Sequence, residues 1–153
     1  MMQPLNYPPA PLKLTRNDGK LFVWDEFRKR KVLLTPEEWV RQHVLHYLIS
    51  SKGYPSGLIA SEHGIKVNQM VRRCDGVVFD KQGTPLLLLE CKAPGVKLTE
   101  KIVHQVAQYN FELKVNWLVM TNGLDTIVAF VNSETQRIDF VPEIPTFEEM
   151  NLT

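Results

Sequence analysis

The sequence predicts a single α/β domain in which helices flank a mixed β-sheet. The chain has 153 residues, of which 44% are hydrophobic, and a chain of this length buries about 70% of the surface that its unfolded form exposes. Segments with strand and helix patterns alternate along it, which favours a mixed sheet with helices packed on its faces. No internal repeat or low-complexity segment is present, so we expect one core.

Charge and cysteine usage narrow the possible functions. The net charge is +1, so a polyanionic partner would have to be held by a local basic patch. The first residues lack the features of a signal peptide, and no apolar run approaches the roughly 20 residues that cross a bilayer. We therefore expect a cytoplasmic protein with no membrane association. The two cysteines, Cys74 and Cys91, have neither zinc-site nor disulfide-framework spacing.

The N-terminal part is predicted to contain an arm followed by a hairpin. Residues 1–13 contain four prolines and should form an extended arm, which leaves residues 14–153 for the folded domain. Residues 20–34 have the pattern of two short strands joined by a polar turn. We expect the basic run at residues 28–31 to be a solvated turn rather than a phosphate-binding patch.

Two helices have clear boundary signals. The first follows the N-cap Thr35, carries Pro36 at its first position and ends at Gly53. The second spans residues 99–114, after a turn at residues 94–95. Both are expected to pack on the sheet.

The remaining segments are predicted to be strands. One lies near residues 65–73, a hairpin occupies residues 72–92, and two more strands follow at residues 117–123 and 126–131. The four leucines at residues 86–89 show no alternation with polar residues. Their strand should therefore be covered on both faces and lie in the centre of the sheet.

The hairpin register brings two carboxylates together. We take Gln82 and Gly83 as a two-residue loop. Counting outward along the antiparallel ladder then sets Asp75 opposite Glu90, with Lys92 projecting on the same side. An odd loop or a bulge would shift Asp75 diagonally. Opposed carboxylates destabilise a sheet, so either a hard divalent cation lies between them or the charges simply reach water at the strand ends.

The same register makes three further predictions. Cys74 and Cys91 should be reduced cross-strand neighbours on the opposite face, with their α-carbons within about 6 Å. Arg73 should face Lys92, where a phosphate could neutralise the two cations. The substitution Asp75→Asn should stabilise the metal-free protein, because it relieves two adjacent negative charges.

The hairpin resembles the PD-(D/E)xK signature of restriction-endonuclease-like nucleases. Asp75, fourteen intervening residues and then Glu90-Cys91-Lys92 are most similar to the nuclease domain at the N-terminus of type I restriction enzyme R subunits. The resemblance extends over residues 35–131, with Cys74 where the signature has proline. It implies a restriction-endonuclease-like fold. The helicase motor that follows this domain in R subunits is not part of the sequence, so we expect the domain to stand alone.

The resemblance also implies a chemistry. It predicts hydrolysis of DNA phosphodiester bonds with Mg²⁺ or Mn²⁺ as the cofactor. Asp75, Glu90 and the backbone carbonyl of Cys91 would hold the ion, which agrees with the preference of Mg²⁺ for oxygen ligands. Lys92 would orient the attacking water or help to deprotonate it. A helicase or methylase would be a suitable partner protein.

The first helix offers two candidates for a further catalytic acid. In restriction R subunits this acid precedes an arginine by about four residues, which selects Glu37 ahead of Arg41. Helical projection places Glu37 near the apolar stripe that faces the core. Glu38 instead completes a capping box with Thr35. We favour Glu37, with Glu38 as the alternative.

The second helix offers a candidate substrate contact. Gln105 and Tyr109 are four residues apart and share a helix face, and they resemble the QxxxY element of exonuclease-type members of the superfamily. Core packing alone would also explain Tyr109, and solvent exposure would explain Gln105. A different class of function is also open: the chain could be a nucleic-acid-binding or assembly module that is inactive without a partner.

Overall fold

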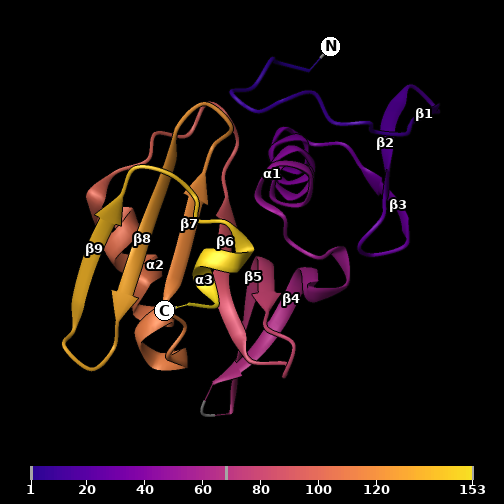
Figure 1. Ribbon diagram of the computed structural model, residues 1–153. Helices are drawn as coiled ribbons and strands as arrows, with labels where there is room; N and C mark the ends of the chain where they lie inside the picture. The colour runs from indigo at the N-terminus through magenta and orange to yellow at the C-terminus, as the bar shows by residue number, and fades with distance from the viewer. Residues whose placement is uncertain (1, 68, 153) are drawn as a thin grey trace.

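The chain folds into two β-sheets and three α-helices within residues 2–67 and 69–152, the part described by this computed structural model (Figure 1). The smaller sheet consists of β1 (Leu14–Asn17), β2 (Lys20–Asp25) and β3 (Arg30–Leu33). The larger sheet consists of β4 (Ile59–Val67), β5 (Met70–Phe79), β6 (Pro85–Cys91), β7 (Trp117–Thr121), β8 (Thr126–Asn132) and β9 (Arg137–Val141). The helices are α1 (Pro36–Lys52), α2 (Glu100–Leu113) and α3 (Phe147–Met150), and a 3₁₀ turn lies at Ser56–Leu58.

The larger sheet is mixed, as the sequence predicts. Its strand order is β4-β5-β6-β7-β8-β9, in which β6 and β7 are parallel and the other neighbouring pairs are antiparallel. Helices α1 and α3 pack on one face, and α2 packs on the other (Figure 1). The predicted α/β fold is therefore confirmed. Among the described residues, no helix has the length and apolar character that a membrane crossing requires.

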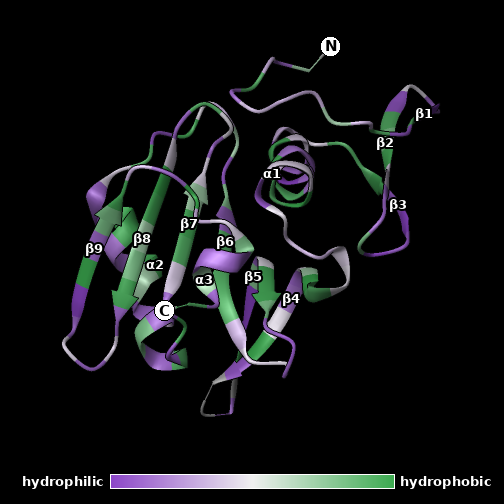
Figure 2. Ribbon diagram, viewed as in Figure 1, coloured by the Kyte–Doolittle hydropathy of each residue, from purple (hydrophilic) through white to green (hydrophobic). Residues whose placement is uncertain are grey.

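Strand β6 lies between β5 and β7 and is covered on both faces. Leu87 and Leu89 belong to the buried cluster beneath α1, whereas Leu88 packs with Tyr109 and Leu113 of α2. Apolar residues concentrate on the central strands of this sheet (Figure 2). The missing polar alternation of the leucine run thus reflects burial on both sides, as predicted.

Helix α1 has the predicted boundaries. The Thr35 hydroxyl accepts a hydrogen bond from the Glu38 N–H at 3.0 Å, and Pro36 is the first helical residue. Gly53 ends the helix with a φ of 71°, in the left-handed region that glycine adopts without strain. Helix α2 is capped in the same way by the Thr99 side chain.

The hairpin between β5 and β6 has a longer loop than predicted, but it keeps the predicted register. Residues Asp80–Thr84 form a five-residue loop, in which the Asp80 side chain accepts hydrogen bonds from two loop N–H groups at 2.9 Å. A bulge near the end of β5 then shifts the ladder by one residue. The odd loop and the bulge compensate each other, so Gly76 still pairs with Leu89.

The two cysteines do not pack on one face, so that prediction is wrong. Cys74 lies with Val77 in the cluster on the α2 side, whereas Cys91 lies in the cluster beneath α1. Strand β5 is irregular at Asp75: paired residues flank it on both sides in the β4 ladder, and Glu62, across from it, has a φ of 48°. This irregularity interrupts the alternation of side chains along the strand. It turns the Asp75 side chain towards α1.

The segment before β1 lies against the rest of the molecule. The Asn6 N–H donates to the Gly123 carbonyl at 2.7 Å, and the Tyr7 hydroxyl donates to Thr121 Oγ1 at 2.9 Å. Leu5 and Tyr7 pack against the cluster beneath α1. The predicted β2–β3 hairpin is present, whereas β1, β9 and α3 have no counterpart in the sequence prediction.

Alanine at Gly123 is expected to destabilise the protein more than alanine at Gly83. The φ angles are +88° and +85°, so either alanine has the strain of left-handed backbone, about 1 kcal/mol. A Cβ at Gly123 would also lie 2.6 Å from Leu5 and 3.1 Å from Val40, whereas nothing lies within 4 Å of a Cβ at Gly83. Urea denaturation should show about 1 kcal/mol of additional loss for Gly123→Ala. Equal losses would contradict this packing of the N-terminal segment.

Candidate active site

The predicted acids and lysine gather where β6 ends beside the first turn of α1. Asp75 lies in β5, Glu90 lies in β6 and Lys92 follows β6, while Glu37 comes from α1. Burial raises the pKa of both Glu37 and Glu90. The charge of Asp75 raises both pKa values further, and the charge of Lys92 lowers them. The four side chains therefore share one electrostatic environment.

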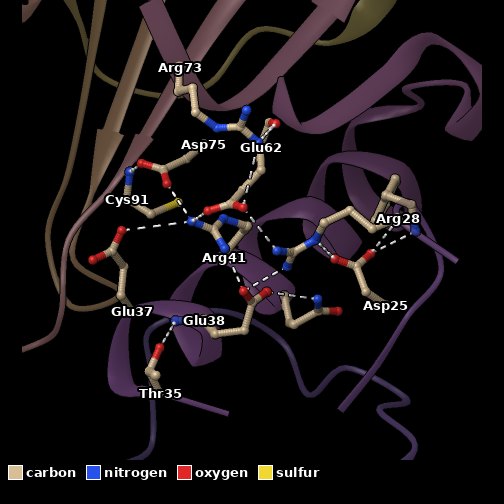
Figure 3. Close-up of polar contacts among 12 residues, drawn as sticks. Asp25, Arg28, Thr35, Glu37, Glu38, Arg41, Glu62, Arg73, Asp75 and Cys91 are labelled. Atoms are coloured by element: carbon tan, nitrogen blue, oxygen red, sulfur yellow. Dashed lines mark hydrogen bonds and ion pairs between the residues drawn. The ribbon is translucent and has the colours of Figure 1, made fainter. Parts of the chain in front are cut away.

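The Asp75 carboxylate is held by donors from two different elements (Figure 3). Its Oδ1 accepts a hydrogen bond from Nη2 of Arg41 in α1, and its Oδ2 accepts one from the backbone N–H of Cys91 in β6 at 2.7 Å. The Arg41 side chain is only 5% exposed, so this charge-assisted bond is shielded from water. Asp75 thereby joins α1 to strands β5 and β6.

The arginine beside Glu90 lies farther from its carboxylate than Arg41 lies from that of Asp75. Oε1 of Glu90 lies 3.6 Å from Nη2 of Arg72, and the Glu90 side chain is 13% exposed. Burial first, and the charge of Asp75 second, raise the pKa of Glu90 from its ordinary value of 4.5 to about 7. A substantial fraction of Glu90 is therefore protonated near neutral pH, and an added positive charge would favour its ionised form.

The two acids in the first turn of α1 have the opposite orientations to those predicted. Glu38 is buried, and its carboxylate accepts hydrogen bonds from Arg28 and Arg41. Glu37 is 48% exposed, with its Oε1 3.7 Å from Nη2 of Arg41. The prediction that Glu37 faces the core is wrong, because helical periodicity does not reveal the buried arginines that draw Glu38 inward. Burial raises the pKa of Glu37, and Glu37 still lies close enough to Asp75 for the charge of Asp75 to raise this pKa further.

Tyr109 of α2 contacts the site indirectly, through Arg72 of β5. The Arg72 guanidinium lies over the Tyr109 ring, 4.0 Å from its centroid, in a cation–π contact that holds it next to Glu90. Gln105, on the same helix, is exposed. The structure therefore connects Tyr109 to the site and leaves Gln105 at the surface.

Arg73 does not face Lys92, so that prediction is wrong. It lies across from Gly64 of β4, and its Nη2 donates to the Glu62 carbonyl at 2.9 Å. The irregularity of β5 at Asp75 prevents the β5–β6 ladder from continuing in the predicted way to Arg73. The Arg73 side chain is 69% exposed, with its Nη2 4.0 Å from Glu62 Oε2.

Two arginines form ion pairs with the acids of the site, although neither is predicted from the sequence to belong to it. Arg41 binds Asp75, and Arg72 lies beside Glu90. Only Arg41 has a signal in the sequence, because it interrupts the apolar face of α1. Arg72 lies between the exposed Val71 and Arg73 in β5, so no pattern marks it. Arg41 and Arg72 supply part of the positive charge that the sequence analysis attributes to a divalent ion.

Comparison with protein families shows that residues 36–145 match the type I restriction enzyme R protein N terminus. The match extends from the first residue of α1 to just before α3 and includes every predicted site residue. The chain belongs to this family. Its N-terminal β1–β3 sheet lies before the first residue that matches the R protein family.

A solved structure has the same fold as this R protein family member. It is a fragment described as an HsdR subunit of a type I restriction enzyme from Vibrio vulnificus YJ016, with a TM-score of 0.56 and 16% sequence identity. The similarity covers 78% of this chain and 25% of that chain, so the present chain corresponds to about a quarter of the longer one. A search of curated proteins finds no match.

The residues of the site have the right chemistry to bind a divalent cation, but their arrangement is less suitable. Asp75, Glu90 and the Cys91 carbonyl offer the oxygen donors that Mg²⁺ prefers, and the raised pKa of Glu90, caused mainly by burial, means that added positive charge would be stabilising. Within the described residues, however, no group of three or more His, Cys, Asp or Glu side chains is arranged to hold a metal ion. The arginines beside both acids would have to share these carboxylates with the cation.

Removing the charge of Asp75 and that of Glu90 should have opposite effects on stability. Asp75→Asn weakens the bonds from Arg41 and Cys91, so we expect the free energy of unfolding to fall by about 1–3 kcal/mol. This reverses the stabilisation expected from the sequence alone. Glu90→Gln removes a charge that burial disfavours, so we expect a rise of about 1–3 kcal/mol at pH 8. Urea denaturation measures both changes.

The effect of Glu90→Gln on the free energy of unfolding should depend on pH. Because the folded protein raises the pKa of Glu90 to about 7 from 4.5, the wild type loses stability as the pH rises through this interval. The advantage of Glu90→Gln should be largest above pH 7 and shrink at pH 5. The exposed Glu134→Gln should change stability by less than about 0.5 kcal/mol at either pH. A destabilised Glu90→Gln at pH 8 would contradict the interpretation.

Proposed function

We propose that the chain is a metal-dependent nuclease that hydrolyses phosphodiester bonds of DNA. The observation that carries this proposal is the convergence of Asp75, Glu90 and Lys92 at the end of β6, beside Glu37 of α1. Membership of the type I restriction enzyme R protein N-terminal family supports a role in restriction-modification. The geometry and the family together favour phosphodiester hydrolysis over other reactions of a carboxylate-lysine site.

Each side chain has a role that suits its chemistry. Asp75, Glu90 and the Cys91 carbonyl would hold Mg²⁺ or Mn²⁺, which polarises a phosphate and acidifies water when bound. Lys92 provides a compact charge that would orient the attacking water and stabilise negative charge as it develops on the phosphate. Glu37, whose pKa is raised by burial and by Asp75, would hold a proton or a water molecule beside this carboxylate.

Residues at the edge of the site would bind the DNA. Arg73 and Gln105 are exposed and can reach phosphate oxygens or base edges. Tyr109 would act through Arg72, whose guanidinium it holds next to Glu90. This assigns the proposed substrate contacts to β5 and α2.

A second candidate is a nucleic-acid-binding or assembly module that cuts DNA only with a partner, such as a helicase or a methylase, or not at all. The bond between Arg41 and Asp75 favours it, because this carboxylate already has a buried cationic partner. The chain also corresponds to only a quarter of the similar solved structure. A partner that moves α1, and Arg41 with it, would free Asp75 for a metal ion.

Cleavage assays distinguish the two candidates. Purified protein should cleave linear, circular or single-stranded DNA in Mg²⁺ or Mn²⁺, with the products resolved on gels. The rate should fall at least about 100-fold in Glu90→Gln and in Lys92→Gln, because each removes a group required for the chemical step. The exposed Glu134→Gln and Lys97→Gln are the matched controls. DNA binding without cleavage by the wild type would favour the module.

Metal binding tests the role of Asp75 directly. Calorimetric titration should detect Mn²⁺ binding to the wild type, and Asp75→Asn should weaken it at least about tenfold, because a ligand is lost. Circular dichroism should verify that the variant is folded, and Glu134→Gln should bind Mn²⁺ like the wild type. Unchanged binding in Asp75→Asn would show that Asp75 is not a metal ligand.

A further inference from the structure

The turn between β2 and β3 contributes an arginine to the interior beside the site. Arg28 donates through Nε to Asp25 and through Nη2 to Glu38 Oε1 at 2.6 Å. Its Nη1 lies 3.4 Å from Glu62 Oε2. The side chain is 12% exposed, so the sequence prediction of a solvated turn is wrong for this residue, although the neighbouring Lys29 is exposed.

Arg41 binds two of the three acids that Arg28 contacts, Glu38 and Glu62 (Figure 3). Its Nη1 donates to Glu38 Oε1, the oxygen that also accepts from Arg28, and its Nη2 lies 3.5 Å from Glu62 Oε1. The same Nη2 donates to Asp75. A continuous chain of ion pairs therefore extends from the β2–β3 turn to the carboxylate of the candidate site.

The charges in this chain are mutually dependent. Glu38, Glu62 and Asp75 supply three carboxylates, and Arg28 and Arg41 supply two guanidinium groups between them. Arg41 already contacts all three acids. Without Arg28, Glu38 and Glu62 would each lose a guanidinium partner and would attract Arg41 more strongly. A buried charge that loses its partner is strongly destabilised, so Arg41 would move towards the first two acids and away from Asp75.

We propose that Arg28 is a positioning residue for the candidate site: it satisfies Glu38 and Glu62, and thereby keeps Arg41 in place to donate to Asp75. The planar guanidinium suits this role because its N–H donors point in fixed directions towards three carboxylates, those of Asp25, Glu38 and Glu62. Arg28 precedes residues 36–145, so this contribution comes from outside the part of the chain that matches the R protein family. Its consequence for catalysis rests on the proposed function.

A double-mutant cycle between Arg28 and Asp75 tests the proposal without requiring activity. The variants are Arg28→Gln, Asp75→Asn and the two combined, compared by their midpoints in urea. Asp75→Asn should lower the midpoint in the wild type, and by less than about half as much in Arg28→Gln, since Arg41 has then already left Asp75. If Arg28 only attaches the small sheet to α1, the two losses will be equal, which would overturn the proposal.

Two matched variants define what the cycle measures. Arg30→Gln removes an exposed arginine from the same hairpin, and its effect should be additive with Asp75→Asn. In an Arg41→Gln background the coupling between Arg28 and Asp75 should disappear, because Arg41 transmits it.

If Arg28→Gln fails to fold, Arg28→Lys replaces it in the cycle. The lysine keeps one positive charge, so this variant should retain part of the coupling. Additive losses in that cycle would overturn the proposal equally.

Cleavage kinetics extend the test to catalysis. Arg28→Gln should lower kcat about tenfold and leave KM for DNA within about twofold, because misplaced Asp75 affects the chemical step more than binding. Arg28→Lys should recover part of kcat, and Arg30→Gln should leave it unchanged. A wild type that does not cleave DNA would contradict the proposed function and leave the stability cycle to decide this proposal. Active protein with additive losses would contradict this proposal alone.

Discussion

The candidate site is built around the carboxylate of Asp75, which is bonded from two directions at once. The Cys91 N–H reaches it from the central strand β6, and Arg41 reaches it from α1. This arrangement requires the irregularity of β5, because a regular strand would direct the side chain to the α2 face with Val77. The same bonds therefore connect α1 to the sheet and hold Asp75 in the candidate site.

Charge balance explains why the two acids of the site differ. Asp75 has a buried guanidinium in direct contact, whereas Arg72 lies farther from Glu90 and is partly exposed. Burial consequently raises the pKa of Glu90 to about 7. One acid thus has donors from the fold in direct contact, and the other would gain most from an added cation. This asymmetry is suitable for a site that binds a metal ion together with a polyanion.

The small β1–β3 sheet adds a layer of support that does not depend on apolar packing alone. It contributes Asp25 and Arg28 to the polar interior, where α1 contributes Glu38 and Arg41. Buried networks of this kind fix one geometry because every member needs its partners. The segment before β1 lies along the same side of the molecule, through Asn6 and contacts with the cluster beneath α1.

The sequence by itself determined the α/β fold, the ends of α1, the buried central strand and the identity of the acids and lysine at its end. These features depend on local signals: the Thr35 cap, the left-handed Gly53, and apolar periodicity. It did not determine which face each acid uses, which of Glu37 and Glu38 is buried, or which arginines partner them. Only the tertiary structure decided these, because they depend on an irregular strand and on ion pairs between residues far apart in the chain, which leave no periodic pattern in the sequence.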